Sequence, residues 1–109
     1  MSRSKGDEAE AKAILFLQKK GFIIVESNYY SRFGEIDIIA TKDGVLHFIE
    51  VKSAREYEGA IYNITPKKVE RIVKTSQVYL KKNALDMEFC YDAVIVTPNA
   101  IELIENILV

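Results

Sequence analysis

The fold of this 109-residue chain is decided by residues 34–53, which read GEIDIIATKDGVLHFIEVKS. Two apolar runs flank Asp43-Gly44, and this dipeptide predicts a two-residue β-hairpin turn because both positions reach positive φ easily. Side chains alternate between the two faces of a strand. The residues expected to share a face are Glu35, Asp37 and Ile39 in the first strand, and Leu46, Phe48, Glu50 and Lys52 in the second.

The turn also predicts which residues face each other across the hairpin. Counting back from it sets Asp37 opposite Glu50 and Glu35 opposite Lys52. The β carbons of directly opposed residues stand about 4.5–5.5 Å apart, and like charges there are destabilising. Two adjacent carboxylates in an apolar hairpin call for a neutralising cation, and hard divalent ions prefer oxygen ligands. Asp37 and Glu50 are therefore candidate metal ligands.

Length and composition predict one folded domain over residues 1–109. Hydrophobic residues make up 49% and charged residues 28%, which is typical of a soluble globular protein. No apolar stretch approaches the roughly 20 residues of a membrane span, and the first residues lack the apolar core of a signal peptide, so we expect a cytoplasmic protein with no membrane partner. The net charge of −1 gives no global attraction to nucleic acid, so such binding would need a local basic surface.

Residues 7–20 read as the first helix, with Asp7 and Glu8 in its first turn and Gly21 after its end. Its apolar positions form one broad arc, and Glu10 falls inside that arc. Two interpretations stay open for Glu10. It reaches solvent at a frayed helix end, or it points along the core face towards the carboxylates of the sheet.

The remaining elements are read from local pattern. Residues 22–25 predict a strand, and residues 29–34 predict a turn that carries three aromatic side chains and Arg32. That turn either stacks on bases and contacts phosphate or simply caps the core. Residues 54–65 show no period and are expected to form a loop beside the hairpin carboxylates. Residues 90–97 predict a strand buried on both faces. Residues 101–109 predict an edge strand, with a C-terminal helix turn as the alternative. The order αβββαββ predicts an α/β protein with a mixed sheet of about five strands flanked by helices.

Thr65-Pro66 predicts the start of a second long helix, with Thr65 as N-cap and Pro66 in the first helical position. One side of that helix is basic. A solvated face is the ordinary explanation for such a run, and a contact with the phosphate backbone is the alternative. The candidate nucleic-acid-binding residues are Arg32 in the preceding turn and Lys67, Lys68, Arg71 and Lys74 on the helix.

The hairpin carboxylates fit phosphodiester chemistry. Mg²⁺ in proteins uses one or two carboxylates, waters and substrate phosphate oxygens. Lys52 would orient a water or stabilise developing negative charge, and Glu10, if inward, would help to position metal or water. The alternative is a surface face of the sheet where these groups only form salt links, with Glu35 paired to Lys52. The lone His47 alternates to the face opposite Glu50 and reads as a packed side chain, and Cys90 as a small buried one.

Gly34-Glu35-Ile36-Asp37-Ile38-Ile39-Ala40, with Phe48-Ile49-Glu50-Val51-Lys52, resembles the signature of the bacterial YraN family. That family is similar to archaeal Holliday-junction resolvases and, more distantly, to the PD-(D/E)xK nucleases; Ile36 stands where the superfamily name has proline. The resemblance implies a restriction-endonuclease-like core with Asp37 and Glu50 as metal ligands. It also implies Lys52 as the catalytic lysine, a contribution from Glu10, and Mg²⁺ as cofactor with Mn²⁺ as an alternative.

Three functions are consistent with these residues. The first is a Mg²⁺-dependent endonuclease that acts on DNA, including branched or flapped DNA, with Glu35 in a supporting role. The second is a non-catalytic nucleic-acid-binding or DNA-repair accessory module that retains the nuclease core. The third is an interaction domain whose acidic face binds a protein. Two copies of a small nuclease core are often needed to reach both strands, so a homodimer is compatible with the first.

Overall fold

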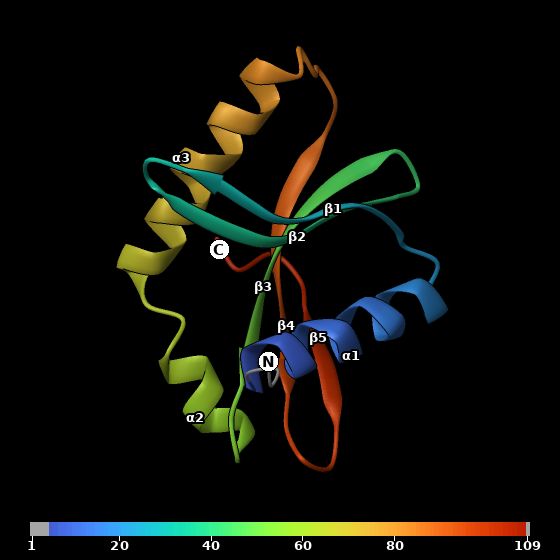
Figure 1. Cartoon of the computed structure of the whole chain (residues 1–109), viewed down its shortest axis with the longest axis vertical. Helices are drawn as coiled ribbons and strands as arrows, with labels where there is room; N and C mark the ends of the chain where they lie inside the picture. Colours follow the sequence, from blue (N-terminus) through green and yellow to red (C-terminus); the bar gives the residue numbers. More distant parts are fainter. Residues whose placement is uncertain (1–4, 109) are drawn as a thin grey trace.

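The computed structural model describes residues 5–108, which build a five-stranded mixed β-sheet with helices on both faces (Figure 1). The elements in chain order are α1 (Lys5–Lys19), β1 (Ile23–Ser31), β2 (Gly34–Lys42), β3 (Val45–Ser53), α2 (Tyr57–Tyr62), α3 (Pro66–Lys82), β4 (Phe89–Val96) and β5 (Ile101–Ile104). The strand order is β1-β2-β3-β4-β5, with β3 and β4 parallel and the other neighbours antiparallel. The predicted α/β class and five-stranded mixed sheet are confirmed.

The central hairpin forms as predicted. Asp43 and Gly44 have φ angles of 51° and 79°, the positive values that a two-residue turn of this kind requires. Pairing between β2 and β3 begins beside the turn and ends at Ile38 opposite Ile49. The predicted register is therefore confirmed along this ladder, and the two strands separate beyond it.

Each face of the sheet packs against a different helix. On one face, the α1 residues Ala13 and Leu17 are completely buried in a cluster with Ile38, Ile49 and Val94. Burying a side chain such as leucine contributes about 1.5–3 kcal/mol, so these contacts fix α1 against the middle of the sheet.

The opposite face packs against α3. This second cluster consists of Ile36, Ile39, Leu46, Phe48, Ile72, Tyr79 and Tyr91. It contains both Leu46 and Phe48, as predicted for β3. In β2 it contains both Ile36 and Ile39, which lie three residues apart, so strict alternation fails between them. The expectation that Glu35, Asp37 and Ile39 share one face is wrong, and the irregularity falls at Asp37.

The predicted turn over residues 29–34 is wrong for most of its length. β1 continues to Ser31, and only Arg32 and Phe33 form the turn into β2. The register between β1 and β2 shifts by one residue at Val25, which is a β-bulge. Pairing with β2 supplies backbone partners that the local sequence does not reveal. Tyr29 packs edge-on against Tyr79 of α3, with ring centroids 5.0 Å apart, so this aromatic belongs to the core.

Residues 54–65, expected as a loop, contain the short helix α2. Its one fully buried side chain, Ala60, packs with Ala93 and Ile95 of β4. Six residues with a single buried position give no readable helical period, which explains why the sequence pattern does not predict this helix.

The remaining predicted elements are confirmed with shifted bounds. Thr65 caps α3, because its hydroxyl oxygen accepts a hydrogen bond from the Lys68 backbone N–H at 3.3 Å, and Pro66 is the first helical residue. β4 is buried from Tyr91 to Val96, and the C-terminal edge strand is limited to β5. No helix within residues 5–108 is long and apolar enough to cross a membrane.

Candidate functional site

Asp37 and Glu50 meet where β2 and β3 separate. Beyond the last ladder pair, the backbone N–H of Val51 donates a hydrogen bond to Asp37 Oδ2 at 2.8 Å. The carboxyl groups of Asp37 and Glu50 are also hydrogen-bonded to each other. The Asp37 side chain thus takes the place of a strand partner at the fork, and the two predicted metal ligands lie side by side.

The surroundings of Asp37 and Glu50 disfavour the ionised form of both carboxyl groups. Burial, reinforced by the charge of Glu50, raises the pKa of Asp37 from 3.8 to about 7. Burial also raises the pKa of Glu50, opposed by its hydrogen bond with Asp37 and by the positive charges of Lys52 and Lys68. A hydrogen bond between two carboxyl groups requires one of them to carry a proton. The environment of the pair therefore favours the protonated form of the carboxyl groups, and a bound cation would offset the repulsion between the two negative charges.

Glu10 points towards the same fork from α1. Its Oε1 accepts a hydrogen bond of 2.8 Å from the side-chain amide of Asn28 on β1. Burial raises the pKa of Glu10, and the charges of Asp37 and Glu35 raise it further against the opposing Asn28 bond. Of the two interpretations left open by the helical pattern, the structure matches the inward one. A pocket of about 240 Å³ brings these residues together; its lining includes Glu10, Asn28, Tyr30, Glu35, Asp37 and Val51.

Asn28 owes its orientation to an unusual backbone. Its φ is 54°, in the left-handed region that asparagine occupies more readily than most residues. The neighbouring pairs of the β1–β2 ladder, Ser27 with Ile38 and Tyr29 with Ile36, place it opposite Asp37. The strand thus bends at the residue that links α1 to the carboxylate fork.

The predicted pairing of Glu35 with Lys52 is wrong. Glu35 pairs instead with Tyr30 across β1–β2, and a hydrogen bond between the two side chains raises the pKa of the Tyr30 phenol. Glu35 and Lys52 do not pair because β2 and β3 separate before the ladder reaches them. Glu35 remains at the site as a carboxylate whose charge acts on Asp37 and Glu50.

Lys52 lies between Glu50 and the start of α3. Its side chain contacts that of Lys68, and this contact with a like charge lowers the pKa of Lys68. The charges of both lysines act on Glu50. The sequence predicts Lys68 only as a phosphate contact, and the structure places it beside the candidate catalytic lysine.

The other predicted phosphate-binding residues cluster where the β1–β2 turn meets α3, a contact visible in Figure 1. The Arg32 guanidinium lies 4.8 Å and the Lys74 ammonium 5.7 Å from the centre of the Phe33 ring. A β carbon placed on Gly34 would lie 3.4 Å from Cβ of Arg71, so the turn sits directly on the helix. Arg32, Arg71 and Lys74 are thereby gathered on one surface.

That surface is exposed and only partly neutralised. Lys67 and Arg71 lie one helical turn apart on α3 and are both exposed. Lys74 forms an exposed ion pair of 3.0 Å with Glu70, which is weak in water. Lys67, Lys68, Arg71, Lys74 and Arg32 are called the basic surface below; it runs from the β1–β2 turn to Lys52.

The carboxylates do not form a closed metal cage. Within residues 5–108, no three acidic side chains bring ligand oxygens within 4.8 Å of one another. Asp37 and Glu50 form a bonded pair, while Asn28 holds Glu10 by a separate bond. A pair matches Mg²⁺, which commonly keeps most of its waters and takes one or two protein carboxylates. A group of three potential ligands of mixed type does gather elsewhere, from His47, Cys90 and Asp92, on the other side of β3 from Glu50.

The sheet, the two flanking helices and the carboxylates at the fork define a mixed α/β protein compatible with a nuclease-like core. The chain belongs to the uncharacterised protein family UPF0102, the YraN family of the sequence resemblance, whose model matches residues 9–96. The chain is 59% identical over 107 residues to the UPF0102 protein of Sulfurimonas denitrificans and 54% identical over 107 residues to that of Wolinella succinogenes. In both cases the match covers 98% of each chain. A UPF0102 protein of Helicobacter pylori is 51% identical over 105 residues, covering 96% of this chain and 91% of the relative.

Two contributors to the site are not assigned by the sequence pattern. Tyr30 reads as a turn aromatic, whereas counting outward from an Arg32–Phe33 turn sets it opposite Glu35. The helical pattern assigns Lys68 to the outer face of the helix, whereas in the structure its side chain contacts Lys52 of β3. Both errors come from contacts between elements that a local pattern does not encode.

Proposed function

We propose that this chain is a metal-dependent phosphodiester hydrolase that acts on DNA, with branched or flapped DNA as the preferred substrate class. The observation that carries the proposal is the Asp37–Glu50 carboxyl pair, half-buried at a strand fork with Lys52 beside Glu50. A salt-linked surface face would leave such carboxylates exposed and individually paired. Here the two carboxyl groups lie together in a place where burial raises the pKa of both.

The residues present fit Mg²⁺ or Mn²⁺. Both ions prefer oxygen ligands, which Asp37 and its neighbour Glu50 offer. Asp37 lines a pocket in which Glu10 and Glu35 add negative charge. When bound, such an ion would lower the pKa of a water and neutralise charge on a phosphodiester under attack. We take water as the nucleophile. Among the described residues that line this pocket there is no cysteine or histidine, and Ser53 therefore has no histidine there to activate it for covalent catalysis.

Three side chains would have further roles in the reaction. Lys52 holds positive charge beside Glu50, where it would stabilise negative charge developing on a phosphate oxygen. Lys68 lies beside Lys52 and adds a second positive charge that acts on Glu50. Glu10, held by Asn28, offers a carboxylate that can accept a hydrogen bond from a water in the pocket.

The basic surface supplies the approach for the nucleic acid. Phosphate contacts position a nucleic acid without reading its sequence, and lysines and arginines provide most of them. Because this surface runs along α3 to Lys68, a backbone lying on it would bring a phosphodiester towards Lys52 and Glu50. Cleavage of both strands of a duplex would then require a second copy of the chain.

The proposal is tested by incubating the protein with linear, flapped and four-way DNA in Mg²⁺ or Mn²⁺. We expect cleavage of a branched substrate that is abolished in Asp37→Asn and Lys52→Ala. Asp43→Asn is the matched control, because Asp43 lies in the exposed β2–β3 turn and asparagine also accepts positive φ. Salt-dependent DNA binding without cleavage would instead support the non-catalytic accessory module. The absence of any DNA binding would instead support the third function, an interaction domain that binds a protein.

A further inference from the structure

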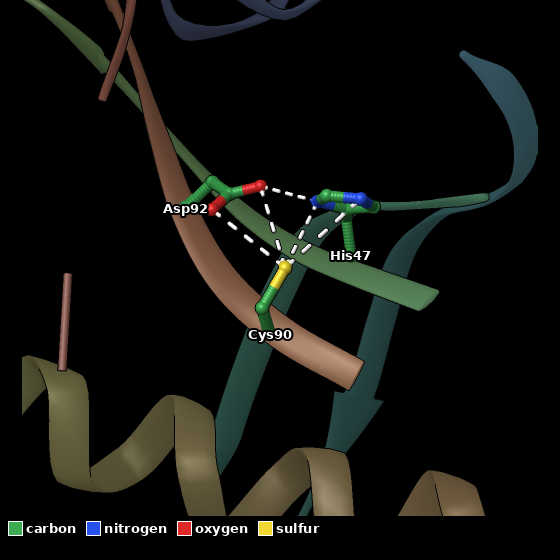
Figure 2. Close-up of side chains that lie close together, drawn as sticks. All are labelled: His47, Cys90 and Asp92. Atoms are coloured by element: carbon green, nitrogen blue, oxygen red, sulfur yellow. Dashed lines mark hydrogen bonds and ion pairs between the residues drawn. The ribbon is translucent and has the colours of Figure 1, made fainter. Parts of the chain in front are cut away.

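A second cluster of potential ligands lies on the other face of β3, near the β2–β3 turn. His47 of β3 and Cys90 and Asp92 of β4 converge there, as Figure 2 shows. Three residues along a strand span about 10 Å, and alternation directs His47 and Glu50 to opposite faces. Nothing in the proposed hydrolysis uses this cluster.

The three side chains are in mutual contact. Nδ1 of His47 lies 2.5 Å from Asp92 Oδ2 and 3.0 Å from the Cys90 sulfur, and the sulfur lies 3.9 Å from both carboxylate oxygens of Asp92. Asp92 is 1% exposed, and the His47 side chain 15%. A carboxylate, an imidazole and a thiol thus meet at the interior end of a pocket of about 300 Å³.

This arrangement does not fit a nucleophilic cysteine. In a catalytic triad the histidine uses one ring nitrogen for the nucleophile and the other for the carboxylate. Here Cys90 and Asp92 both approach Nδ1, while Nε2 lies 4.0 Å from the sulfur. Burial and the charge of Asp92 raise the pKa of the Cys90 thiol to about 12, the opposite of what an activated thiol needs.

The same arrangement fits a metal ion. Ligand atoms at about 2.0–2.3 Å from a tetrahedral Zn²⁺ stand roughly 3.3–3.7 Å apart. The three contacts between Nδ1, the sulfur and Oδ2 measure 2.5, 3.0 and 3.9 Å, so a change of less than about 1 Å in each would admit the ion.

Outer contacts already orient two of the three ligands. Oδ1 of Asp92 accepts a hydrogen bond of 2.9 Å from the backbone N–H of Asn106, which leaves Oδ2 directed at His47. The His47 ring packs edge-on against Phe22, with centroids 4.9 Å apart. Partners of this kind hold metal ligands in position in established sites. Glu105 lines the same pocket and its charge acts on Cys90, so its carboxylate is available as a fourth ligand.

We propose that His47, Cys90 and Asp92 form a Zn²⁺ site, separate from the carboxylate fork, with Glu105 or water in the fourth position. Thiolate and imidazole ligands select zinc over the hard ion assigned to Asp37 and Glu50. The ion would join β3, β4 and the segment after β5. That segment already contacts the sheet through the backbone hydrogen bond from Ile107 N–H to the Tyr91 carbonyl at 2.8 Å. The site would therefore hold the segment after β5 against β3 and β4.

Cobalt substitution tests the site directly, because Cys90 is the only cysteine in the chain. Reduced protein freed of metal with a chelator is titrated with Co²⁺ and followed by its absorption spectrum. We expect a thiolate-to-cobalt charge-transfer band in the near ultraviolet that saturates at one equivalent and is abolished by Zn²⁺. Cobalt at the carboxylate fork would bind without that band, so the two sites are distinguished.

Variants complete the test. Cys90→Ser should lose the band, His47→Gln should weaken cobalt binding at least tenfold, and the double variant Asp37→Asn, Glu50→Gln should keep the band. Zinc should raise the melting temperature of the unmodified protein and leave that of Cys90→Ser unchanged. Absence of the charge-transfer band in the unmodified protein would overturn the proposal, and so would equal zinc stabilisation of Cys90→Ser.

Discussion

Replacing Asp37 with asparagine should stabilise the metal-free protein, and the gain should depend on pH. Asparagine has the shape of the protonated aspartate. Its carbonyl oxygen can accept the hydrogen bond from Val51 N–H, and its amide can donate to Glu50. The variant therefore keeps both contacts at the fork while removing the buried charge.

The magnitude follows from the pKa of Asp37, which rises from 3.8 to about 7 on folding because of burial and the charge of Glu50. Between these values the folded chain keeps a proton that the unfolded chain has released, so the free energy of unfolding falls as pH rises and levels off above about 7. Each pH unit is worth about 1.4 kcal/mol, which sets an upper limit of about 4 kcal/mol. The advantage of Asp37→Asn should grow by about 2–3 kcal/mol between pH 5 and pH 8.

Urea denaturation at pH 5 and pH 8 in the presence of a chelator measures this difference. Asp43→Asn serves as the matched control, since it removes an exposed carboxylate from the β2–β3 turn and should change the free energy of unfolding by no more than about 0.5 kcal/mol at either pH. A loss of stability in Asp37→Asn at pH 8 would contradict a raised pKa of Asp37 in the folded chain. So would a gain that is the same at both pH values.

Three further results are expected. Reversing the charges of Lys67 and Arg71 should weaken DNA binding, as measured by fluorescence anisotropy. The slope of log affinity against log salt concentration should fall by about 1 for each phosphate that the protein no longer neutralises. Calorimetric titration with Mg²⁺ in two buffers at pH 6 should show proton release, because the ion displaces the proton held at Asp37, and this release should vanish by pH 8.5. Gly34→Ala should lower the free energy of unfolding by about 1–3 kcal/mol, because φ is 155° there. Gly59→Ala, inside α2 with open space around it, should raise the free energy by about 0.5–1 kcal/mol.

Each of these expectations has a matched comparison. Charge reversal at Lys81 and Lys82, at the far end of α3, should affect DNA binding less than reversal at Lys67 and Arg71. An equal effect would remove the basic surface as the binding site. Magnesium binding at pH 6 without proton release would contradict a raised pKa of Asp37. A melting temperature for Gly34→Ala equal to that of the unmodified protein would contradict the backbone strain expected for a side chain at the φ of Gly34.

The central hairpin could be predicted from sequence because its information is local. Asp43-Gly44 specifies the turn, and the turn specifies the register as far as Ile38 and Ile49. What lies beyond that pair could not be predicted by counting, because the strands separate there and Asp37 bonds to Val51 N–H instead of continuing the ladder.

The rest of the candidate site depends on contacts between distant elements. The inward direction of Glu10 follows from its bond to Asn28, eighteen residues away, and the position of Lys68 beside Lys52 follows from how α3 crosses the sheet. The His47–Cys90–Asp92 cluster requires the parallel pairing of β3 with β4, which sets His47 opposite Cys90. Local pattern contains none of these pairings.

Titration with Mn²⁺ followed by electron paramagnetic resonance measures most directly whether Asp37 and Glu50 hold a divalent cation. We expect one tightly bound Mn²⁺ per chain at pH 8, absent in Asp37→Asn although that variant is at least as stable as the unmodified protein. Asp43→Asn should bind Mn²⁺ like the unmodified chain. Equal Mn²⁺ binding by Asp37→Asn and the unmodified protein would rule out this carboxyl pair as the metal site.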